Sequence, residues 1–171
     1  MQNIEVKARL RDREAVEGRL QALGARREWT ARQTDTFFRV PEGWLKLREA
    51  EGRAPELISY RRSTSEAGPR ASQYDVRPLD DAGAWKRLLG RVLPVEGVVR
   101  KERTLWMRGH TRIHLDRVDG LGDFAELETV VEGIDPEGAR AEAGGLAEAL
   151  GLDPADFLSV PYLVLLRREG P

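Results

Sequence analysis

The strongest constraint on the fold is an alternation of polar and apolar residues that recurs along most of the chain. In segment 3–10 (NIEVKARL) the odd positions are polar or charged and the even positions are apolar. Residues i and i+2 of a strand lie on the same face, so this segment predicts a strand with one ionic and one apolar face. Segment 124–130 (FAELETV) repeats the pattern, with Glu126 and Glu128 on one face. The pattern indicates β-structure built around a charged site.

Composition and charge narrow the kind of protein that carries these strands. A length of 171 residues suits one domain spanning residues 1–171. The formal net charge is -1, so no global basic field would recruit nucleic acid, and no nucleic-acid partner is expected. There is no cysteine, and no apolar run approaches the roughly 18 to 20 residues of a membrane span. We therefore expect a cytoplasmic protein without disulfides, thiolate metal sites or membrane attachment.

Alternation predicts eight strands, near residues 2–10, 33–40, 43–49, 56–63, 72–78, 97–107, 110–118 and 122–132. Residues 41–43 (PEG) and 108–109 (RG) predict tight turns that join the second strand to the third and the sixth to the seventh. The stretch 63–71 is rich in Ser, Gly and Pro and predicts a mobile loop.

Helical periodicity predicts helices over residues 12–24, 80–94 and 135–151. Each has an aspartate that can cap its first turn, and in the third helix proline follows this cap. Gly144 and Gly145 weaken the middle of that third helix. Two short helices are predicted after Asp153 and Ser159.

Eight mostly antiparallel strands with a few helices are compatible with a barrel or a sandwich. The amphipathic helices carry apolar stripes that match the apolar strand faces, and a helix layer outside would turn the ionic faces inward. The sequence therefore predicts a β-dominated α+β fold, an eight-stranded antiparallel closed barrel with helices packed outside. The alternative is that each ionic face is solvated, as in a half-exposed sheet.

The cations recur at same-face spacing on their strands, which favours the enclosed arrangement. They are Lys7, Arg9, Lys46, Arg48, Arg62, Lys101, Arg103 and Arg112. Enclosing so many cations without a partner would cost several kcal/mol per ion, and a polyanionic ligand would relieve that cost. Arginine offers a planar fork for phosphate oxygens and lysine a point charge. The set predicts a ligand with several phosphate groups.

Carboxylates on the same faces would bind a hard cation. Glu5, Glu126, Glu128 and Asp116 are the candidates, and an oxygen-only donor set favours Mg²⁺ or Mn²⁺ over zinc. Neither histidine has a second histidine at ligand spacing. His110 falls in a predicted turn, whereas His114 shares the face of Arg112 and Asp116 and is a candidate substrate contact.

Eight segments in order resemble the CYTH superfamily, the triphosphate tunnel metalloenzymes. They are 3–7 (NIEVK), 33–38 (QTDTFF), 45–49 (LKLRE), 60–62 (YRR), 99–103 (VRKER), 112–116 (RIHLD), 121–124 (LGDF) and 126–128 (ELE). The family includes class IV adenylate cyclases, thiamine triphosphatases and inorganic tripolyphosphatases. The resemblance implies an eight-stranded antiparallel tunnel in which basic residues hold a triphosphate and glutamates hold a divalent metal.

The resemblance also implies roles for individual residues. Lys7, Arg48, Lys101 and Arg103 would act in catalysis; Lys46, Arg62, Arg112 and Arg9 would bind substrate; Glu5, Glu126, Glu128 and Asp116 would hold Mg²⁺ or Mn²⁺. Gln33, Asp35 and Tyr60 are open to structural or functional roles. One position departs from the family pattern, because Asn3 stands where the opening motif has its first glutamate. An asparagine offers a carbonyl oxygen but no charge, which leaves the number of metals open.

The function expected from these residues is metal-dependent processing of a triphosphate, with tripolyphosphate, thiamine triphosphate or ATP as substrate. Hydrolysis needs a positioned water, whereas cyclisation to cyclic AMP and pyrophosphate needs a ribose hydroxyl at the α-phosphate. We favour a phosphohydrolase, with a class IV-type adenylate cyclase as the alternative. A non-catalytic polyphosphate- or nucleotide-binding protein is the alternative from another class, and a homodimer is one option for assembly. An RNA-binding β-domain is disfavoured, since aromatics are only 6% and scattered.

Overall fold

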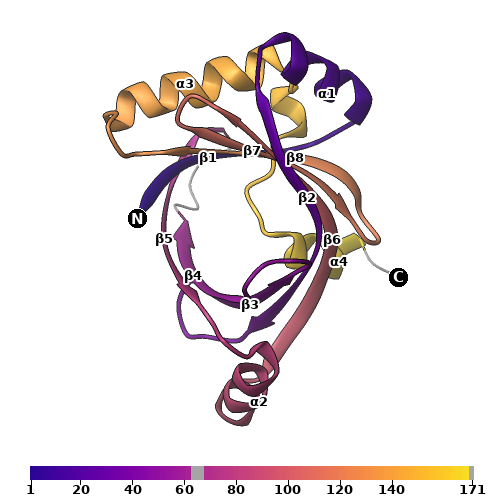
Figure 1. Ribbon diagram of the computed structural model, residues 1–171, viewed down its shortest axis with the longest axis vertical. Helices are drawn as coiled ribbons and strands as arrows, with labels where there is room; N and C mark the ends of the chain where they lie inside the picture. The colour runs from indigo at the N-terminus through magenta and orange to yellow at the C-terminus, as the bar shows by residue number, and fades with distance from the viewer. Residues whose placement is uncertain (63–67, 170–171) are drawn as a thin grey trace.

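The computed structural model describes residues 1–62 and 68–169, with only the backbone of Arg62 described. Within these residues, eight strands form a closed antiparallel barrel in the order β1-β5-β4-β3-β2-β6-β7-β8 (Figure 1). The strands are β1 (Gln2–Arg9), β2 (Arg26–Phe38), β3 (Trp44–Ala50), β4 (Glu56–Arg62), β5 (Arg70–Pro78), β6 (Val95–Arg108), β7 (Thr111–Val118) and β8 (Gly122–Val130). Pairing of Glu5 with Glu128 and of Lys7 with Glu126 closes the barrel between β1 and β8. The predicted fold class is confirmed.

The helices follow the predicted caps. They are α1 (Arg13–Ala22), α2 (Ala82–Val92), α3 (Pro136–Ala149), the 3-10 turn η1 (Pro154–Asp156) and α4 (Tyr162–Glu169). The Asp12, Asp81 and Asp135 carboxylates accept hydrogen bonds from backbone N–H groups of the first turns of α1, α2 and α3, which satisfies donors that a helix start leaves unpaired. Gly144 and Gly145 do not interrupt α3.

One apolar core lies outside the barrel, between the strands and two helices. The even positions of β1 meet Val16 and Leu20 of α1 and Ala143 and Leu146 of α3 in one buried cluster. In Figure 1, α3 and α1 lie together over the same side of the barrel. Because the apolar faces of the strands face these helices, the charged faces of β1, β7 and β8 point inward, as the alternation predicts.

A second apolar cluster lies on inward-facing strand positions, where the alternation predicts charged residues. It joins Phe37, Ile58, Tyr60 and Val99 of the barrel wall to residues of α4, including Tyr162. Figure 1 shows the C-terminal segment, drawn in yellow, leaving the layer of α1 and α3 and running to α4 beside β6. The barrel interior is therefore partly apolar, which the charge pattern of the strands did not indicate.

Two strand boundaries correct the sequence prediction. β2 begins at Arg26 rather than near residue 33, because it pairs with β6 along its whole length through a bulge between Arg27 and Trp29. Strict alternation is lost at the bulge, so the pattern concealed this half of the strand. β5 begins at Arg70, where β1 pairs with it, so the end of the predicted loop 63–71 is strand. Residues 63–67 of that loop lie outside the described residues.

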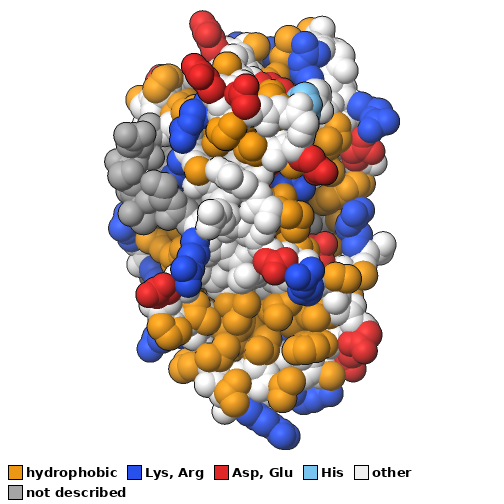
Figure 2. Space-filling view, turned by 90° about the vertical axis from the view of Figure 1, so that its left-hand side faces the viewer, with side chains coloured by type: hydrophobic (Ala, Val, Ile, Leu, Met, Phe, Trp, Pro, Cys, Tyr) orange, Lys and Arg blue, Asp and Glu red, His pale blue; other side chains and the backbone are white. Residues whose placement is uncertain are grey.

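One end of the molecule carries an apolar surface. Figure 2 shows hydrophobic side chains gathered in a broad band at the lower end, the end where Figure 1 places α2. No described residue of α2 is fully buried, and Leu88 and Val92 are 55% and 72% exposed. Across the described residues, every helix is too short or too polar to span a lipid bilayer.

Candidate active site

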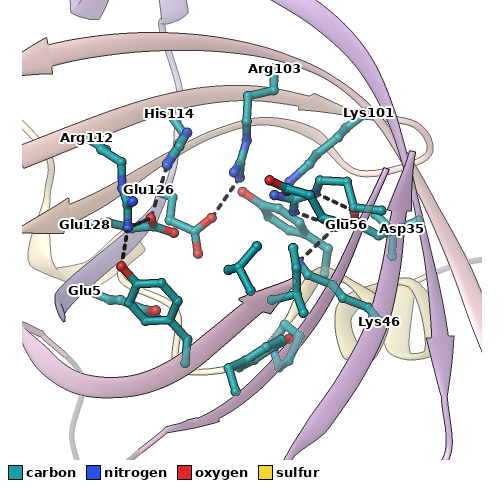
Figure 3. Close-up of a pocket in the computed structure, with 18 of the residues that line it drawn as sticks. Glu5, Asp35, Lys46, Glu56, Lys101, Arg103, Arg112, His114, Glu126 and Glu128 are labelled. Atoms are coloured by element: carbon teal, nitrogen blue, oxygen red, sulfur yellow. Dashed lines mark hydrogen bonds and ion pairs between the residues drawn. The ribbon is translucent and has the colours of Figure 1, made fainter. Parts of the chain in front are cut away.

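A cavity of about 270 Å³ lies inside the barrel, and all eight strands contribute to its lining. Nine of the twelve predicted site residues line it: Glu5, Lys7, Lys46, Arg48, Lys101, Arg103, Arg112, Glu126 and Glu128. Most of them lie at alternate positions of β1, β3, β6 and β8, because side chains at i and i+2 share the inner face. Figure 3 shows these ionic side chains converging from different strands.

Asp35 of β2 holds the two cations of β3. Its carboxylate lies 2.9 Å from Lys46 Nζ and accepts a bidentate pair of hydrogen bonds from Arg48, at 2.7 and 2.9 Å. Burial alone would raise the pKa of Asp35, but Arg48 and Lys46 outweigh burial and hold that pKa well below its usual range. Asp35 therefore stays ionised, and it fixes where Lys46 and Arg48 present their remaining N–H donors.

Asp116 of β7 repeats this arrangement on the cations of β6. It lies 3.0 Å from Lys101 Nζ and receives two hydrogen bonds of 2.6 Å from Arg103. The Tyr162 hydroxyl donates a further hydrogen bond of 2.9 Å to Asp116. Asp116 is completely buried, so it lies behind the lining, where it orients Lys101 and Arg103.

Glu126 of β8 connects the first and sixth strands. Its carboxylate pairs with Lys7 Nζ at 3.0 Å and with Arg103 at 2.9 Å, and all three side chains are almost fully buried. Arg103 thus bridges Asp116 and Glu126. This continuous ionic network satisfies buried charges that would be costly if left alone.

Glu128 lies at the more open part of the same wall. It pairs with Arg112 at 3.0 Å and with His114 Nε2 at 3.3 Å, and Arg112 also donates a hydrogen bond to the Tyr74 hydroxyl. Burial would raise the pKa of Glu128, but His114 and Arg112 outweigh it and lower that pKa. Burial and the nearby Arg103 lower the pKa of His114. Glu128 is therefore ionised and faces the cavity beside Glu126 (Figure 3).

Two lysines in the cavity titrate near neutral pH. Burial, and then the neighbouring Arg103, lower the pKa of Lys101 to about 7. Burial and the neighbouring Arg48 lower the pKa of Lys46 to about 8. Both shifts have the sign expected where cations are crowded and desolvated. An anion placed among these cations would favour the protonated lysines.

Tyr162 of α4 forms part of the cavity lining that the sequence did not reveal. Its ring lies 4.2 Å from Lys7 Nζ and 5.1 Å from Lys101 Nζ, so both ammonium groups contact its π face. Burial, and then the charge of Asp116, raise the pKa of Tyr162 well above its usual value, so its hydroxyl stays a hydrogen-bond donor. The sequence predicts a short helix here but carries no signal that this helix would enter the site.

The other three predicted site residues lie elsewhere. Arg9 Nη2 lies 2.8 Å from both carboxylate oxygens of Glu169, and the guanidinium contacts the Phe124 ring, so Arg9 lies beside α4. Asp116 is the buried counter-ion described above. The side chain of Arg62 lies outside the described residues. Among residues that the sequence left unassigned, Trp29, Arg53, Glu56 and Tyr74 also line the cavity.

The acidic residues can accommodate magnesium or manganese, although they do not form a complete cage. Across the described residues, no three acidic or histidine side chains form a group that would hold a metal ion alone. Mg²⁺ usually takes one or two carboxylates and fills its remaining positions with water and substrate phosphate oxygens. Glu126 and Glu128 supply two such carboxylates on one wall, and Glu5 is the direct cross-strand partner of Glu128. The donor set fits a metal that arrives with a phosphate ligand.

The sequence model of the CYTH domain matches residues 1–161 of this chain. The chain belongs to the CYTH family. A related protein, the adenylate cyclase CyaB of Aeromonas hydrophila, is 29% identical over 97% of this chain and 89% of its own length.

Two solved structures of similar fold are both putative adenylate cyclases. The structure from Vibrio parahaemolyticus has a TM-score of 0.81 at 21% identity and covers 96% of this chain and 97% of its own. The structure from Hippeastrum has a TM-score of 0.63 at 17% identity and covers 97% of this chain and 95% of its own. It is described as having a dominant triphosphatase activity. At these identities the two structures show a shared fold, and the family membership supports an enzyme that acts on triphosphates.

Proposed function

We propose that this CYTH protein is a divalent-metal-dependent phosphohydrolase that cleaves a P–O–P linkage of a triphosphate. The observation that carries the proposal is the opposition of charges inside one cavity. Seven cations line it, namely Lys7, Lys46, Arg48, Arg53, Lys101, Arg103 and Arg112, and Glu126 and Glu128 face the same space. A phosphate chain would satisfy the cations, and the carboxylates would hold Mg²⁺ or Mn²⁺ against its oxygens.

Some cavity residues would bind the phosphate chain, and some would also stabilise the charge that develops during cleavage. Lys46 and Arg48 are fixed by Asp35, and Lys101 and Arg103 by Asp116, so two preorganised pairs would bind the chain from separate walls. Preorganised cations of this kind stabilise charge that develops on the leaving phosphate. A metal bound through Glu5, Glu126 and Glu128 would neutralise phosphate charge and orient the chain. Arg112 would extend the grip near these carboxylates.

Cyclisation is the second candidate, and a specific observation favours it. The relative that matches almost the whole chain at 29% identity is an adenylate cyclase. The grip on the triphosphate would serve both reactions, which differ in whether water or a ribose hydroxyl is the nucleophile.

The deciding experiment incubates pure protein and Mg²⁺ or Mn²⁺ with tripolyphosphate, thiamine triphosphate and ATP, and identifies the products. We expect release of orthophosphate. Formation of cyclic AMP and pyrophosphate from ATP would show that the protein is a cyclase and not a hydrolase. Tight binding of all three compounds without turnover would overturn both and leave a phosphate-binding protein.

A further inference from the structure

Two buried polar side chains are direct neighbours on the inner face of the barrel. Asn3 of β1 and Ser72 of β5 are cross-strand partners, and they are 2% and 1% exposed. Among the described residues, nothing bonds to Asn3 Oδ1 or to Ser72 Oγ. Asn3 lines the cavity, and Ser72 shares the inner face with Tyr74, which also lines it. Buried oxygens are normally paired with protein or with ordered water, so this neutral pair, Asn3 and Ser72, indicates a bound ligand.

The size and polarity of the neutral pair fit one water molecule. Side chains that lie directly opposite on antiparallel strands have Cβ atoms about 4.5–5.5 Å apart, so a single water can reach both oxygens. The amide oxygen of Asn3 accepts a hydrogen bond, and the Ser72 hydroxyl accepts or donates one. Both groups are uncharged, so they would hold water without the charge that binds a phosphate or a magnesium ion.

The neutral pair lies beside the proposed metal ligands and away from the cations of β3 and β6. Asn3, Glu5 and Lys7 take successive inward positions of β1, and all three line the cavity. Figure 3 shows Glu5 well apart from Lys46 and Lys101, across the cavity. A phosphate chain that these two lysines bind, with its end at the proposed metal site of Glu5, would therefore have its terminal phosphate next to the neutral pair.

We propose that the neutral pair holds the water that attacks the terminal phosphorus. This inference rests on the proposed hydrolysis and adds the residues that position its nucleophile. Phosphoryl transfer needs the attacking and leaving oxygens roughly in line, and the pair lies on the side of Glu5, across from the lysines that would hold the leaving pyrophosphate.

The chemistry of the attack suits neutral residues. The water oxygen bonds to phosphorus, the bridging P–O bond breaks with its electron pair on pyrophosphate, and one water proton passes to an oxygen of the transferred phosphate. Because the transition state of phosphoryl transfer is loose, the water needs placement more than deprotonation. Two hydrogen-bonding oxygens provide that placement.

The test measures kcat for tripolyphosphate with Mg²⁺, and Kd for tripolyphosphate by calorimetry without added metal. Ser72→Ala and Asn3→Leu each remove one oxygen of the pair with little change in shape. Misplacement of a reacting group costs on the order of 100-fold in rate, so kcat should fall about 10- to 100-fold in each variant. Kd should stay unchanged. Ser72→Thr keeps the hydroxyl and should retain most of the wild-type kcat.

A matched control and thermal unfolding separate this role from a structural one. Ser59→Ala makes the same chemical change on β4, where Ser59 is exposed, and should leave kcat and Kd unchanged. Ser72→Ala should keep the wild-type Tm, because Ser72 Oγ has no hydrogen bond to a described residue to lose.

Three results would overturn the water site. They are an unchanged kcat in both variants, an equal loss of kcat and affinity, and a loss in Asn3→Leu that high Mg²⁺ restores, since Asn3 would then be a metal ligand. A wild-type protein that binds tripolyphosphate but releases no orthophosphate from it would instead refute the proposed hydrolysis, and the water site with it.

Discussion

At the scale of single residues, two buried aspartates explain how the protein keeps several cations in one cavity and still folds. Asp35 and Asp116 each bind one lysine and one arginine that lie two residues apart on the neighbouring strand. The sequence predicted those cation pairs from their spacing. It did not identify the counter-ions, because pairing across strands depends on register rather than on local pattern.

Glu128→Gln tests the carboxylates as metal ligands. The side chain keeps its shape and loses its charge, so turnover should fall about 100-fold or more at low Mg²⁺, and part of the loss should return at high Mg²⁺. The measurement is turnover as a function of metal concentration. Glu17→Gln, on the surface of α1, is the control and should behave as wild type. Full activity of the Glu128 variant at low metal would show that this glutamate is not a ligand.

The two lysines predict a pH dependence of ligand binding. The pKa values are about 7 for Lys101 and about 8 for Lys46, and a polyanion binds their protonated forms. Between about pH 7 and 9 both lysines lose their protons, whereas the phosphate groups, whose second ionisation begins near pH 6, stay anionic. Affinity for tripolyphosphate should therefore fall by nearly three orders of magnitude, about 500-fold, between pH 7 and 9 if both lysines must be charged.

The same pKa shifts determine whether the stability of the ligand-free protein rises or falls with pH. Each folded pKa is below the unfolded lysine value of about 10.4, so the unfolded chain binds more protons between the two values. Stability should therefore rise as pH increases from about 7 toward 10 through these groups. The double variant Lys46→Arg, Lys101→Arg keeps its charges and should flatten the dependence of affinity on pH. The same dependence in that variant would show that other groups titrate.

At the scale of elements, helix α4 is fixed to the barrel at three points. Arg9 pairs with Glu169, Arg167 pairs with Glu96, and Leu163 packs against Gly97 of β6. These contacts hold Tyr162 beneath Lys7 and Lys101. The sequence predicted a helix here from Pro161, but contacts between residues so far apart in the chain leave no periodic signal.

Gly97→Ala tests whether the position of α4 matters. A Cβ at Gly97 would lie 2.5 Å from Leu163 Cδ1, so the helix or its side chains must move. We expect a loss of about 1–3 kcal/mol in the free energy of unfolding, together with reduced turnover because Tyr162 adjoins Leu163. Denaturant unfolding and turnover should be measured on the same preparation.

The matched control is Gly144→Ala in α3, where an added Cβ meets open space. Alanine favours a helix interior over glycine, so this variant should gain about 0.5–1 kcal/mol and keep its activity. Equal stability and turnover of Gly97→Ala and wild type would show that α4 can adjust without consequence for the site.

The strands show why part of the fold was predictable. Where one face is buried and the other ionic, as in β1 and β8, alternation gave the strand and its inward residues. A bulge interrupts the alternation between Arg27 and Trp29 in β2. The alternation therefore did not predict this half of the strand, and Trp29 was not identified as a cavity residue. The predicted start of β5 was wrong for a related reason, since pairing with β1 extends the strand into a segment with turn-like composition.

At the scale of the whole molecule, the apolar end that Figure 2 shows predicts self-association through α2. Leu88 and Val92 are exposed one turn apart on α2, and Val95 follows at 54% exposure. The helix has Asp80 and Asp81 at its start and Arg87 and Arg91 toward its end, all exposed. In an antiparallel pair of α2 helices from two copies, the acidic end of each would meet the basic end of the other.

Sedimentation as a function of concentration should therefore show a dimer, and Leu88→Glu should shift it to monomer without loss of secondary structure. Leu79→Glu would place the same charge outside the helix seam and should weaken the dimer less. A wild-type protein that stays monomeric at every accessible concentration would contradict this assembly.

The proposed triphosphate site can be tested by comparing the thermal stability of the protein in tripolyphosphate, pyrophosphate and orthophosphate at matched ionic strength. If cations on several walls bind one phosphate chain, as proposed, the stabilisation should grow with the length of that chain. At about a hundredfold excess over its Kd a ligand adds about 2.7 kcal/mol, which is visible as a shift in Tm. The predicted order is tripolyphosphate above pyrophosphate above orthophosphate. Equal shifts for all three would indicate general screening of charge and contradict a triphosphate site in the barrel.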